Sequence, residues 1–331
     1  MAYDGKIMRR ALQRLEEDRR RRADRFQEQR EEIFRRQPRL RRIQEELTST
    51  ASRIITQALR QGGDPRAAIE RLRDENLALQ AERKRLLGEL GLAEDALDEK
   101  PACPLCNDTG LRGEAYCRCL RPYYTQEQKK DLSRMLDLGS QSFDTFSLEW
   151  YSEVVPEGMP RSARTQMERV YNHCAEFAHG FGRKAGNLLL FGAPGLGKTH
   201  LSAAIAREVS EKGFSVVYDT AGHVFERFEQ QKFGRDEEEA VSSDVRRILN
   251  ADLLILDDLG TEMTTAFVQS ALYQIVNTRL MERRSTIIST NLSPMVLAQR
   301  YGAQVASRLE GEYEMLPFVG EDIRKQKKAR W

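Results

Sequence analysis

The chain has 331 residues, with 53 basic and 51 acidic side chains and a formal net charge of +2. No apolar run approaches the roughly 18 residues that a membrane-spanning helix needs, and the first residues lack the apolar core of a signal peptide. These features exclude an integral membrane protein, so we expect a cytoplasmic chain with no membrane partner, and the length predicts about two domains.

The near-zero net charge hides an uneven distribution along the chain. Residues 9–42 hold 14 Arg and 7 acidic residues, a local net of +7, whereas residues 43–100 hold 9 basic and 12 acidic residues, a net of −3. Two interpretations of the Arg-rich stretch are open. It is either a solvated helix face, whose acidic residues at helical spacing partly neutralise the arginines, or a stripe that binds a polyanion.

Residues 1–97 read as helical hairpins or coiled coil. Apolar residues at helical spacing run through residues 7–60, with a break at Pro38, and Gly62-Gly63 ends that stretch. Asp64-Pro65 then supplies an N-cap and a first helical residue for the next helix. A heptad-like seam follows in that helix, made of Ile69, Leu72, Asn76, Leu79, Arg83, Leu86 and Leu90.

Residues 101–122 change in character and contain four of the five cysteines, with the spacing Cys103-x2-Cys106-x10-Cys117-x-Cys119. Two close pairs of thiolates can supply the tetrahedral ligand set that Zn²⁺ prefers, and so short a segment needs a metal in place of a core. A structural zinc site is therefore predicted, with a redox pair or an iron–sulfur cluster as the alternatives. Cys174 stands apart on a helix and is predicted to be a core residue.

From residue 186 onward, short apolar strands alternate with helices, which predicts a parallel sheet with helical crossovers. Helix is also predicted at 126–138 and 161–179, before the first strand. The predicted strands are 187–191, 215–218, 253–256, 286–290 and 313–318. The predicted helices between them are 199–212, 222–233, a short one ending near 249, 265–283, 294–300 and 303–310, with an acidic and serine-rich loop at 234–244.

Residues 192–199, Gly-Ala-Pro-Gly-Leu-Gly-Lys-Thr, match the phosphate-binding loop pattern G-x-x-x-x-G-K-[ST] between a strand and a helix. Glycines such as Gly192, Gly195 and Gly197 let backbone N–H groups face an anionic phosphate, and the helix N-terminus favours negative charge there. Lys198 is expected to reach the β- and γ-phosphates of ATP, and Thr199 to offer its hydroxyl to Mg²⁺.

The apolar run Leu253–Leu256 ends in Asp257 and Asp258, at the sheet edge where ligands of α/β proteins bind. Asp257 is expected to hold the Mg²⁺ shell and Asp258 to polarise the attacking water, although Asp258 could instead cap a following turn. The next strand ends in Ser-Thr-Asn. Asn291 there is either a residue that orients water beside the γ-phosphate or a turn residue.

Together these motifs resemble those of an AAA+ ATPase. The sequence of residues 140–331 resembles bacterial replicative-helicase loaders of the DnaC/DnaI type and the related IstB transposition ATPases. The resemblance rests on SFDTFSLEWY, NLLLFGAPGLGKTHLSAAIA, LLILDDLG, TIISTNLSP, the Ala-Ser-Arg-Leu segment at 306–309 and the closing Gly-Glu-Asp-Ile-Arg. The Walker B motif, residues 253–258, ends in Asp-Asp where many AAA+ proteins have Asp-Glu. This difference suggests slow, switch-like hydrolysis of ATP.

The resemblance implies roles for further residues. Arg308 is implied to be an arginine finger that acts on the ATP of a neighbouring copy, so the ATPase domain would self-associate. Arg324 is implied to sense the nucleotide in the same subunit, and Asn291 takes the first sensor role. A zinc-stapled module ahead of the ATPase is implied to bind the helicase.

The sequence therefore predicts an α/β AAA+ P-loop NTPase with a parallel sheet, preceded by a helical region and a small zinc module with four cysteine ligands. The predicted parts are residues 1–97, the zinc module and linker helix at 98–138, and the ATPase at 139–331. The predicted function is ATP-dependent loading of a hexameric replicative helicase onto single-stranded DNA, with ATP, Mg²⁺ and Zn²⁺ as cofactors.

Two other functions are open at this point. One is an IstB-like transposition helper that binds duplex DNA and a transposase, for which a zinc module is not expected. The other is a nucleotide-gated scaffold with little hydrolysis. The candidate contacts with single-stranded DNA are Lys232 and Arg235, and the nearby Phe225, Phe228 and Phe233 are either stacking or core residues.

Overall fold

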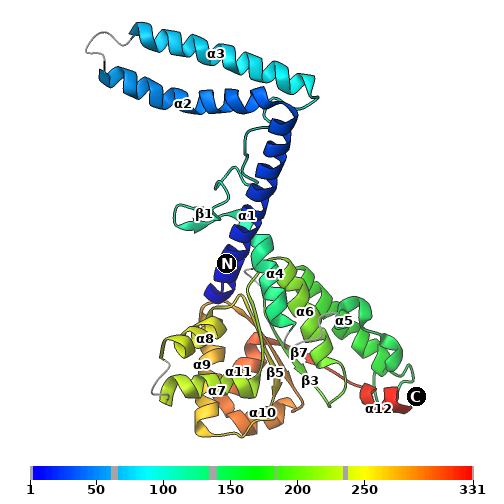
Figure 1. The fold of residues 1–331 in the computed structure, drawn as a ribbon. Coiled ribbons are helices and arrows are strands. Elements are labelled where there is room, and N and C mark those ends of the chain that lie inside the picture. Colours follow the sequence, from blue (N-terminus) through cyan, green and yellow to red (C-terminus); the bar gives the residue numbers. More distant parts are fainter. Residues whose placement is uncertain (1–2, 61–65, 134–139, 183–184, 234–237, 330–331) are drawn as a thin grey trace. The chain divides into compact units, whose positions relative to one another are not determined.

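The computed structural model describes residues 3–60, 66–133, 140–182, 185–233 and 238–329 (Figure 1). The chain divides into two compact units. One is formed by Met1–Leu12 together with Cys119–Trp331, and the other by Gln13–Arg118. The division predicted from sequence, at residues 97 and 138, stays a prediction.

Three long helices open the chain: α1 (Gly5–Arg36), α2 (Pro38–Arg60) and α3 (Arg66–Glu89). The predicted break falls at Gln37, because proline is favoured at the first position of a helix. The predicted stop at Gly62-Gly63 and restart at Asp64-Pro65 lie outside the described residues. In the Gln13–Arg118 unit, α2 packs against α3, and an apolar cluster forms from Ile33, Phe34, Leu40, Ile43, Leu86, Leu87 and Leu97.

The arginines of α1 pair along their own helix. Arg19 and Arg20 both lie within 3.3 Å of Glu16, and Arg21 pairs with Asp18. All three arginine side chains remain more than half exposed. Ion pairs one helical turn apart stabilise a solvent-facing helix by only tenths of a kcal/mol, roughly 0.2–0.5 each. These contacts favour the interpretation of this stretch as a solvated helix face.

The unit formed by Met1–Leu12 and Cys119–Trp331 contains a five-stranded parallel sheet in the order β4-β5-β6-β3-β7. Its strands are β3 (Asn187–Phe191), β4 (Val216–Thr220), β5 (Leu253–Leu259), β6 (Ser285–Thr290) and β7 (Tyr313–Pro317). Its helices are α4 (Arg121–Leu132), α5 (Ala163–His179), α6 (Lys198–Glu211), α7 (Ala221–Phe233), α8 (Glu238–Asn250), α9 (Ala266–Met281), α10 (Pro294–Tyr301), α11 (Ala303–Glu312) and α12 (Ile323–Ala329). The parallel sheet confirms the predicted α/β class.

The sheet is covered on both faces, so alternate strand residues enter two separate cores (Figure 1). Leu188 and Leu190 of β3 pack with α5 and α6, whereas Leu189 between them packs on the other side with α7, α8, α9, α10 and α11. Burial on both faces explains why these strands read as continuous apolar runs. Cys174 of α5 is fully buried in the first core, as predicted.

The helices of the structure differ from the predicted elements in three places. α4 begins at Arg121 rather than Gln126 and ends at Leu132, with Ser133 as its C-cap. The predicted acidic loop is helix from Glu238 onward. The C-terminal helix α12, which contains Arg324, was not predicted at all. Within the described ranges, no helix is both long and apolar enough to cross a membrane.

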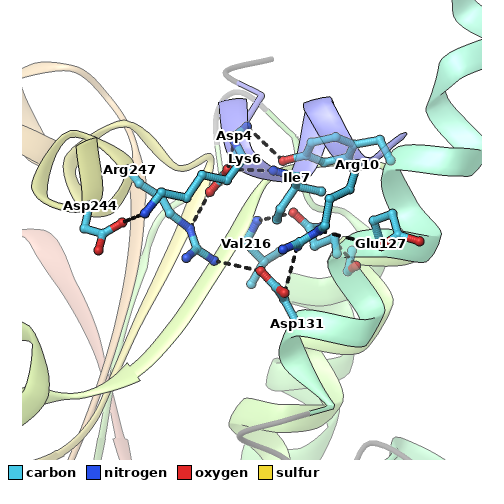
Figure 2. A network of polar contacts seen from close by, with 12 residues as sticks. Asp4, Lys6, Ile7, Arg10, Glu127, Asp131, Val216, Asp244 and Arg247 are labelled. Atoms are coloured by element: carbon cyan, nitrogen blue, oxygen red, sulfur yellow. Dashed lines mark hydrogen bonds and ion pairs between the residues drawn. The ribbon is translucent and has the colours of Figure 1, made fainter. Parts of the chain in front are cut away.

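The start of α1 belongs to the unit that holds the five-stranded sheet and contacts its helices through ion pairs (Figure 2). Asp4 pairs with Arg247 of α8 and accepts a hydrogen bond from the N–H of Ile7, 3.0 Å away. Lys6 pairs with Asp244 of α8 at 2.7 Å. Arg10 reaches the other way, to Asp131 of α4 at 2.7 Å and Glu127 at 3.7 Å. Residues 4–10 therefore join α4 to α8, a contact between distant segments that no spacing in the sequence predicts.

Candidate nucleotide-binding and metal sites

The loop between β3 and α6, residues 192–197, has glycines where side chains would not fit. A Cβ at Gly192 would lie 2.3 Å from the carbonyl oxygen of Phe318, and a Cβ at Gly195 would lie 1.9 Å from the carboxyl group of Asp322. Both glycines have positive φ, +143° and +78°, which favours glycine over other residues. The loop can therefore present backbone N–H groups closely to an anion, at the N-terminus of α6.

Lys198 begins α6, and its side chain is buried in the loop, with a residue exposure of 5%. Its Nζ donates hydrogen bonds to the carbonyl oxygens of Gly192 and Ala193, at 2.7 and 2.8 Å, and to Oδ1 of Asn291 at 2.6 Å. Burial lowers the pKa of Lys198, and the nearby aspartate charges oppose that change. The structure thus brings together a buried amine, the glycine loop and the end of β6.

Asp257 lies at the end of β5 and accepts hydrogen bonds from three hydroxyl groups. Thr199 donates to Oδ2 at 3.1 Å, Tyr218 of β4 donates to Oδ2 at 2.6 Å, and Ser289 of β6 donates to Oδ1. Burial raises the pKa of Tyr218, and the charge of Asp257 raises it further, so the phenol remains a donor. Thr199 and Asp257, which were each predicted to hold Mg²⁺, are therefore in contact.

Asp258 is half-buried and has a φ of +54°, which is unusual for a residue other than glycine. Its N–H donates to Oγ of Ser289 at 3.1 Å, and its carbonyl oxygen accepts from Oγ1 of Thr261 at 3.0 Å. Burial raises the pKa of Asp258, the charge of Asp257 adds to that, and Lys198 opposes it. A carboxylate of raised pKa is a better proton acceptor, which suits the predicted role toward water.

A pocket of about 440 Å³ lies over the loop, within the size range of ligand sites. Its lining includes most of the residues singled out from sequence, namely Gly195, Gly197, Lys198, Thr199, Asp258, Asn291 and Arg324. The sequence did not predict that the SFDTFSLEWY segment, residues 142–151, also lines the pocket. Thr145, Phe146 and Trp150 contribute from that segment, and His200 lies beside them. The aromatic content of the connector was a visible signal, but nothing in its spacing pointed to this pocket.

The residues present fit a magnesium-bound nucleoside triphosphate. The glycine loop, Lys198 and the exposed Arg324 could hold phosphate groups, because they supply backbone N–H groups and cations. Thr199 and Asp257 could hold Mg²⁺, which prefers carboxylate and hydroxyl oxygens. Bound there, the metal would neutralise charge on the phosphates.

Arg308 is placed apart from this pocket. It lies half-buried on α11 with its guanidinium 5.3 Å from the ring centroid of Tyr273, whose hydroxyl oxygen accepts a hydrogen bond from it at 3.3 Å. Among the described residues, those that line the pocket do not include Arg308. The role on a neighbouring copy that the resemblance implied for Arg308 stays a prediction.

The four cysteines of residues 103–119 form one cluster, with all four Sγ atoms within 4.8 Å of one another. Sγ of Cys103 and Sγ of Cys117 are 3.7 Å apart. Four sulfurs bound tetrahedrally to one zinc at about 2.3 Å are roughly 3.8 Å from each other, so the cluster fits Zn²⁺. Asp108 supports it locally, because its buried carboxylate accepts the N–H of Cys103 at 2.7 Å.

A short antiparallel hairpin, β1 (Leu111–Arg112) and β2 (Ala115–Tyr116), separates the two cysteine pairs. The turn between its strands uses Gly113 at a φ of +60°, as two-residue hairpin turns require. The N–H of Cys117 donates to the carbonyl oxygen of Gly110 at 2.8 Å. The hairpin thereby returns the second pair of thiols to the first.

We expect the purified protein to bind one Zn²⁺ per chain. Replacing Cys117 by serine should lower zinc retention at least about tenfold, because it removes one of four soft ligands. Metal content is measured by mass spectrometry after dialysis against a weak chelator. Cys174→Ala is the matched control, since this thiol lies in the core of the sheet-containing unit. Equal zinc in the two variants would contradict the assignment.

The fold and the pocket define a P-loop nucleotide-binding domain. Residues 168–330 match the family model described as IstB-like ATP binding protein. This segment is therefore similar to that family of ATP-binding proteins, and the resemblance inferred from the motifs is confirmed. The match covers β3, the glycine loop, Asp257 and Asp258. It does not cover the three N-terminal helices α1–α3 or the segment that contains the four clustered cysteines.

Two named relatives illustrate what this segment resembles. The replicative helicase loader DnaC of Buchnera aphidicola is 29% identical over 154 residues, which cover 46% of this chain and 61% of that protein. A putative insertion sequence ATP-binding protein of Sinorhizobium fredii is 34% identical over 108 residues, or 33% of this chain and 35% of that protein. The chain spans about half the length of the curated relatives it matches.

A crystal structure of the DnaC helicase loader is also similar to this chain. The comparison gives 25% sequence identity and a TM-score of 0.45, and it covers 55% of this chain and 99% of that chain.

Proposed function

We propose that the protein is an ATP-dependent loader of a hexameric replicative helicase onto single-stranded DNA, acting in the cytoplasm. The observation that carries the proposal is the convergence of Lys198, Thr199, Asp258, Asn291 and Arg324 on one pocket, in a domain similar to the DnaC loader of Buchnera aphidicola. The pocket supplies the nucleotide switch, and the similarity suggests what the switch controls.

In this proposal the chain hydrolyses ATP slowly. Asp258 accepts the proton of the attacking water, and Asn291 orients that water from the end of β6. Lys198 and Arg324 stabilise negative charge that develops on the phosphate oxygens. Asp258 has a shorter side chain than the glutamate of many AAA+ proteins, which is the reason to expect a low turnover number.

Assembly is proposed to complete the site. A resident cation within the subunit does not neutralise all the charge of the transition state, and an arginine supplied from outside lowers the barrier further. Arg308 is assigned that role on the ATP of a neighbouring copy. Its absence from the described lining of its own pocket supports the proposal, because a finger acting in trans serves the pocket of another subunit.

Single-stranded DNA is proposed to contact the end of α7. Phe233 is 63% exposed, and its ring lies 5.8 Å from that of Phe267. Nζ of Lys232 lies 5.5 Å from both ring centroids. Exposed rings beside a cation are what bases stack on in single-stranded DNA sites. Phe225 and Phe228 are buried in the core instead, and Arg235 lies outside the described residues.

The helical region and the cysteine module are proposed to bind the helicase. A pull-down with the full-length chain and the replicative helicase of the same organism tests the proposed helicase binding. Each protein is immobilised in turn, and the other is added in solution. We expect a stable complex that the Cys117→Ser variant weakens. Failure of the zinc-loaded wild-type chain to bind the helicase would contradict the proposal.

Replacing Asp258 by asparagine should lower the turnover number for ATP by about a hundredfold or more, because a general base is worth roughly 10²–10⁴. ATP affinity should change less than about threefold, since asparagine has the same shape. Phosphate release and nucleotide titration measure the two quantities. Asp219→Asn is the control, because Asp219 lies at the end of β4 and pairs with His223 at 2.7 Å.

The wild-type rate itself separates this proposal from a scaffold that barely hydrolyses ATP. Undetectable phosphate release in the presence of helicase and single-stranded DNA would favour the scaffold. Unchanged turnover in the Asp258→Asn variant would remove Asp258 as the base.

A second candidate function is an IstB-like transposition helper, favoured by the family match and by the Sinorhizobium fredii relative. Such a protein would bind duplex DNA and a transposase. The four-cysteine cluster argues for the loader, because no zinc module is expected in the transposition helpers. Tighter binding to duplex than to single-stranded DNA, with no helicase complex, would favour the second candidate.

A further inference from the structure

The hydroxyl group of Ser289 contacts both aspartates at the end of β5. Ser289 is fully buried on β6, two residues before Asn291. Its Oγ donates a hydrogen bond to Oδ1 of Asp257 and accepts one from the N–H of Asp258, 3.1 Å away. One hydroxyl therefore links the carboxylate of the first aspartate to the backbone of the second.

The strand register explains why a side chain makes this link. Leu256 is paired with Ile288 and Leu259 with Thr290, so two residues of β5 lie opposite the single residue Ser289. An insertion of this kind interrupts the ladder of backbone hydrogen bonds and redirects side chains. The N–H of Asp258 has left the regular ladder, and the serine hydroxyl accepts it instead.

The backbone of Asp258 needs such support. Its φ of +54° is sparsely populated by residues other than glycine, and a conformation of this kind persists only where its surroundings hold it. The hydroxyl of Ser289 accepts a hydrogen bond from the N–H of Asp258, and the hydroxyl of Thr261 donates one to the carbonyl oxygen of Asp258. The direction of the Asp258 carboxylate follows from this backbone conformation.

We propose that Ser289 is a positioning residue for ATP hydrolysis, which fixes Asp258 relative to Asp257. The inference rests on the proposed ATPase function and deepens it. Ser289 does not line the described part of the pocket, so it acts through the aspartates rather than on the nucleotide. Loss of its hydroxyl leaves the nucleotide site in place but releases the carboxylate that faces the attacking water.

Replacing Ser289 by alanine should lower the turnover number about ten- to a hundredfold, as expected when a reacting group is displaced by a fraction of an ångström to one ångström. The KM for ATP should change less than about twofold. Ser289→Thr keeps the hydroxyl and should restore most of the turnover. If the alanine variant does not fold, Ser289→Cys offers a similar shape with only a weak donor, and the same loss is expected.

Tyr218→Phe is the matched control. It also removes one buried hydroxyl from Asp257, but that hydroxyl has no contact with Asp258 among the described hydrogen bonds. We expect a smaller loss of turnover than in Ser289→Ala. An equal or larger loss in Tyr218→Phe would show that support of Asp257, and not the link to Asp258, is what matters, and would overturn the inference.

A double-mutant cycle gives the decisive comparison. If Ser289 works through Asp258, adding Ser289→Ala to the Asp258→Asn variant should lower turnover less than about threefold further, because residues that act as a unit are not additive. Full additivity would overturn the inference, as would wild-type turnover in Ser289→Ala. Absence of turnover in the wild-type chain would instead count against the proposed function itself.

Discussion

Replacing Lys198 by alanine is expected to weaken ATP binding at least about a hundredfold, or roughly 2.7 kcal/mol. The Nζ group lies between the glycine loop and Asn291 and would exchange its bonds to the Gly192 and Ala193 carbonyl oxygens for bonds to phosphate. Charge-assisted hydrogen bonds of this kind are about twice as strong as neutral ones. Without the amine, the pocket loses one of the cations that offset the repulsion between the phosphate oxygens and the two aspartates.

Titration with a fluorescent ATP analogue in the presence of Mg²⁺ measures the effect. Arg207→Ala is the control, because it removes a cation from the same helix α6, and its contact with Glu211 lies at the far end of that helix. The control should bind the analogue as the wild type does. Near-equal affinities of the wild type and Lys198→Ala would mean that the loop does not bind the phosphates of ATP.

Replacing Arg279 by methionine should lower the free energy of unfolding by about 3–5 kcal/mol. Arg279 is fully buried on α9, and its guanidinium donates to the carbonyl oxygens of Ile248, Leu249 and Ala251 at 2.9–3.0 Å. It also donates to the carbonyl oxygen of Ser285 at 2.6 Å. These carbonyl groups lie at the C-terminal end of α8 and at the first residue of β6. Methionine in place of Arg279 would leave several of these buried acceptors without donors.

Denaturant unfolding followed by circular dichroism measures this change. Arg246→Met is the control, since Arg246 is an exposed residue of α8, and surface changes usually stay within about 0.5 kcal/mol. A loss below about 1 kcal/mol in Arg279→Met would show that these carbonyls find other donors. Burial lowers the pKa of Arg279 to about 9, so the comparison belongs near pH 7, where the group is charged.

Much of the candidate site was predictable because the carboxyl ends of parallel strands all lie at the same edge of the sheet. Lys198 follows β3, Asp257 and Asp258 end β5, and Asn291 follows β6. Once the alternation of strands and helices identified a parallel sheet, these residues had to converge. The glycine spacing fixed the loop between them, because only glycine tolerates its backbone angles.

Other parts depend on contacts that no spacing encodes. Ser289 and Tyr218 look like ordinary strand residues, and their contact with Asp257 follows from strand order and from an irregular register. The apolar stripe at the start of α1 was visible, but the partners of the neighbouring Lys6 and Arg10 were not. They are Asp244 of α8 and Asp131 of α4, more than a hundred residues away. Tertiary contacts of that kind decide which of several helical faces is buried.

The start of α8 shows a different difficulty. Aspartate and serine residues favour loops in isolation, and residues 234–244 were predicted to be a loop because they are rich in acidic residues and serine. From Glu238 onward the segment is helical. Val241 and Val245 of this helix are buried, and Val245 packs in the core beneath α7 and α9. Packing of an amphipathic face outweighs weak local preferences.

The proposed loading function is most directly tested by the amount of replicative helicase loaded onto circular single-stranded DNA. The helicase is incubated with closed circles, ATP and the chain, and the DNA-bound fraction is separated by gel filtration. We predict loading that requires ATP and the chain, and that the Lys198→Ala variant abolishes. Equal loading with and without the wild-type chain, under conditions where it binds ATP, would contradict this function.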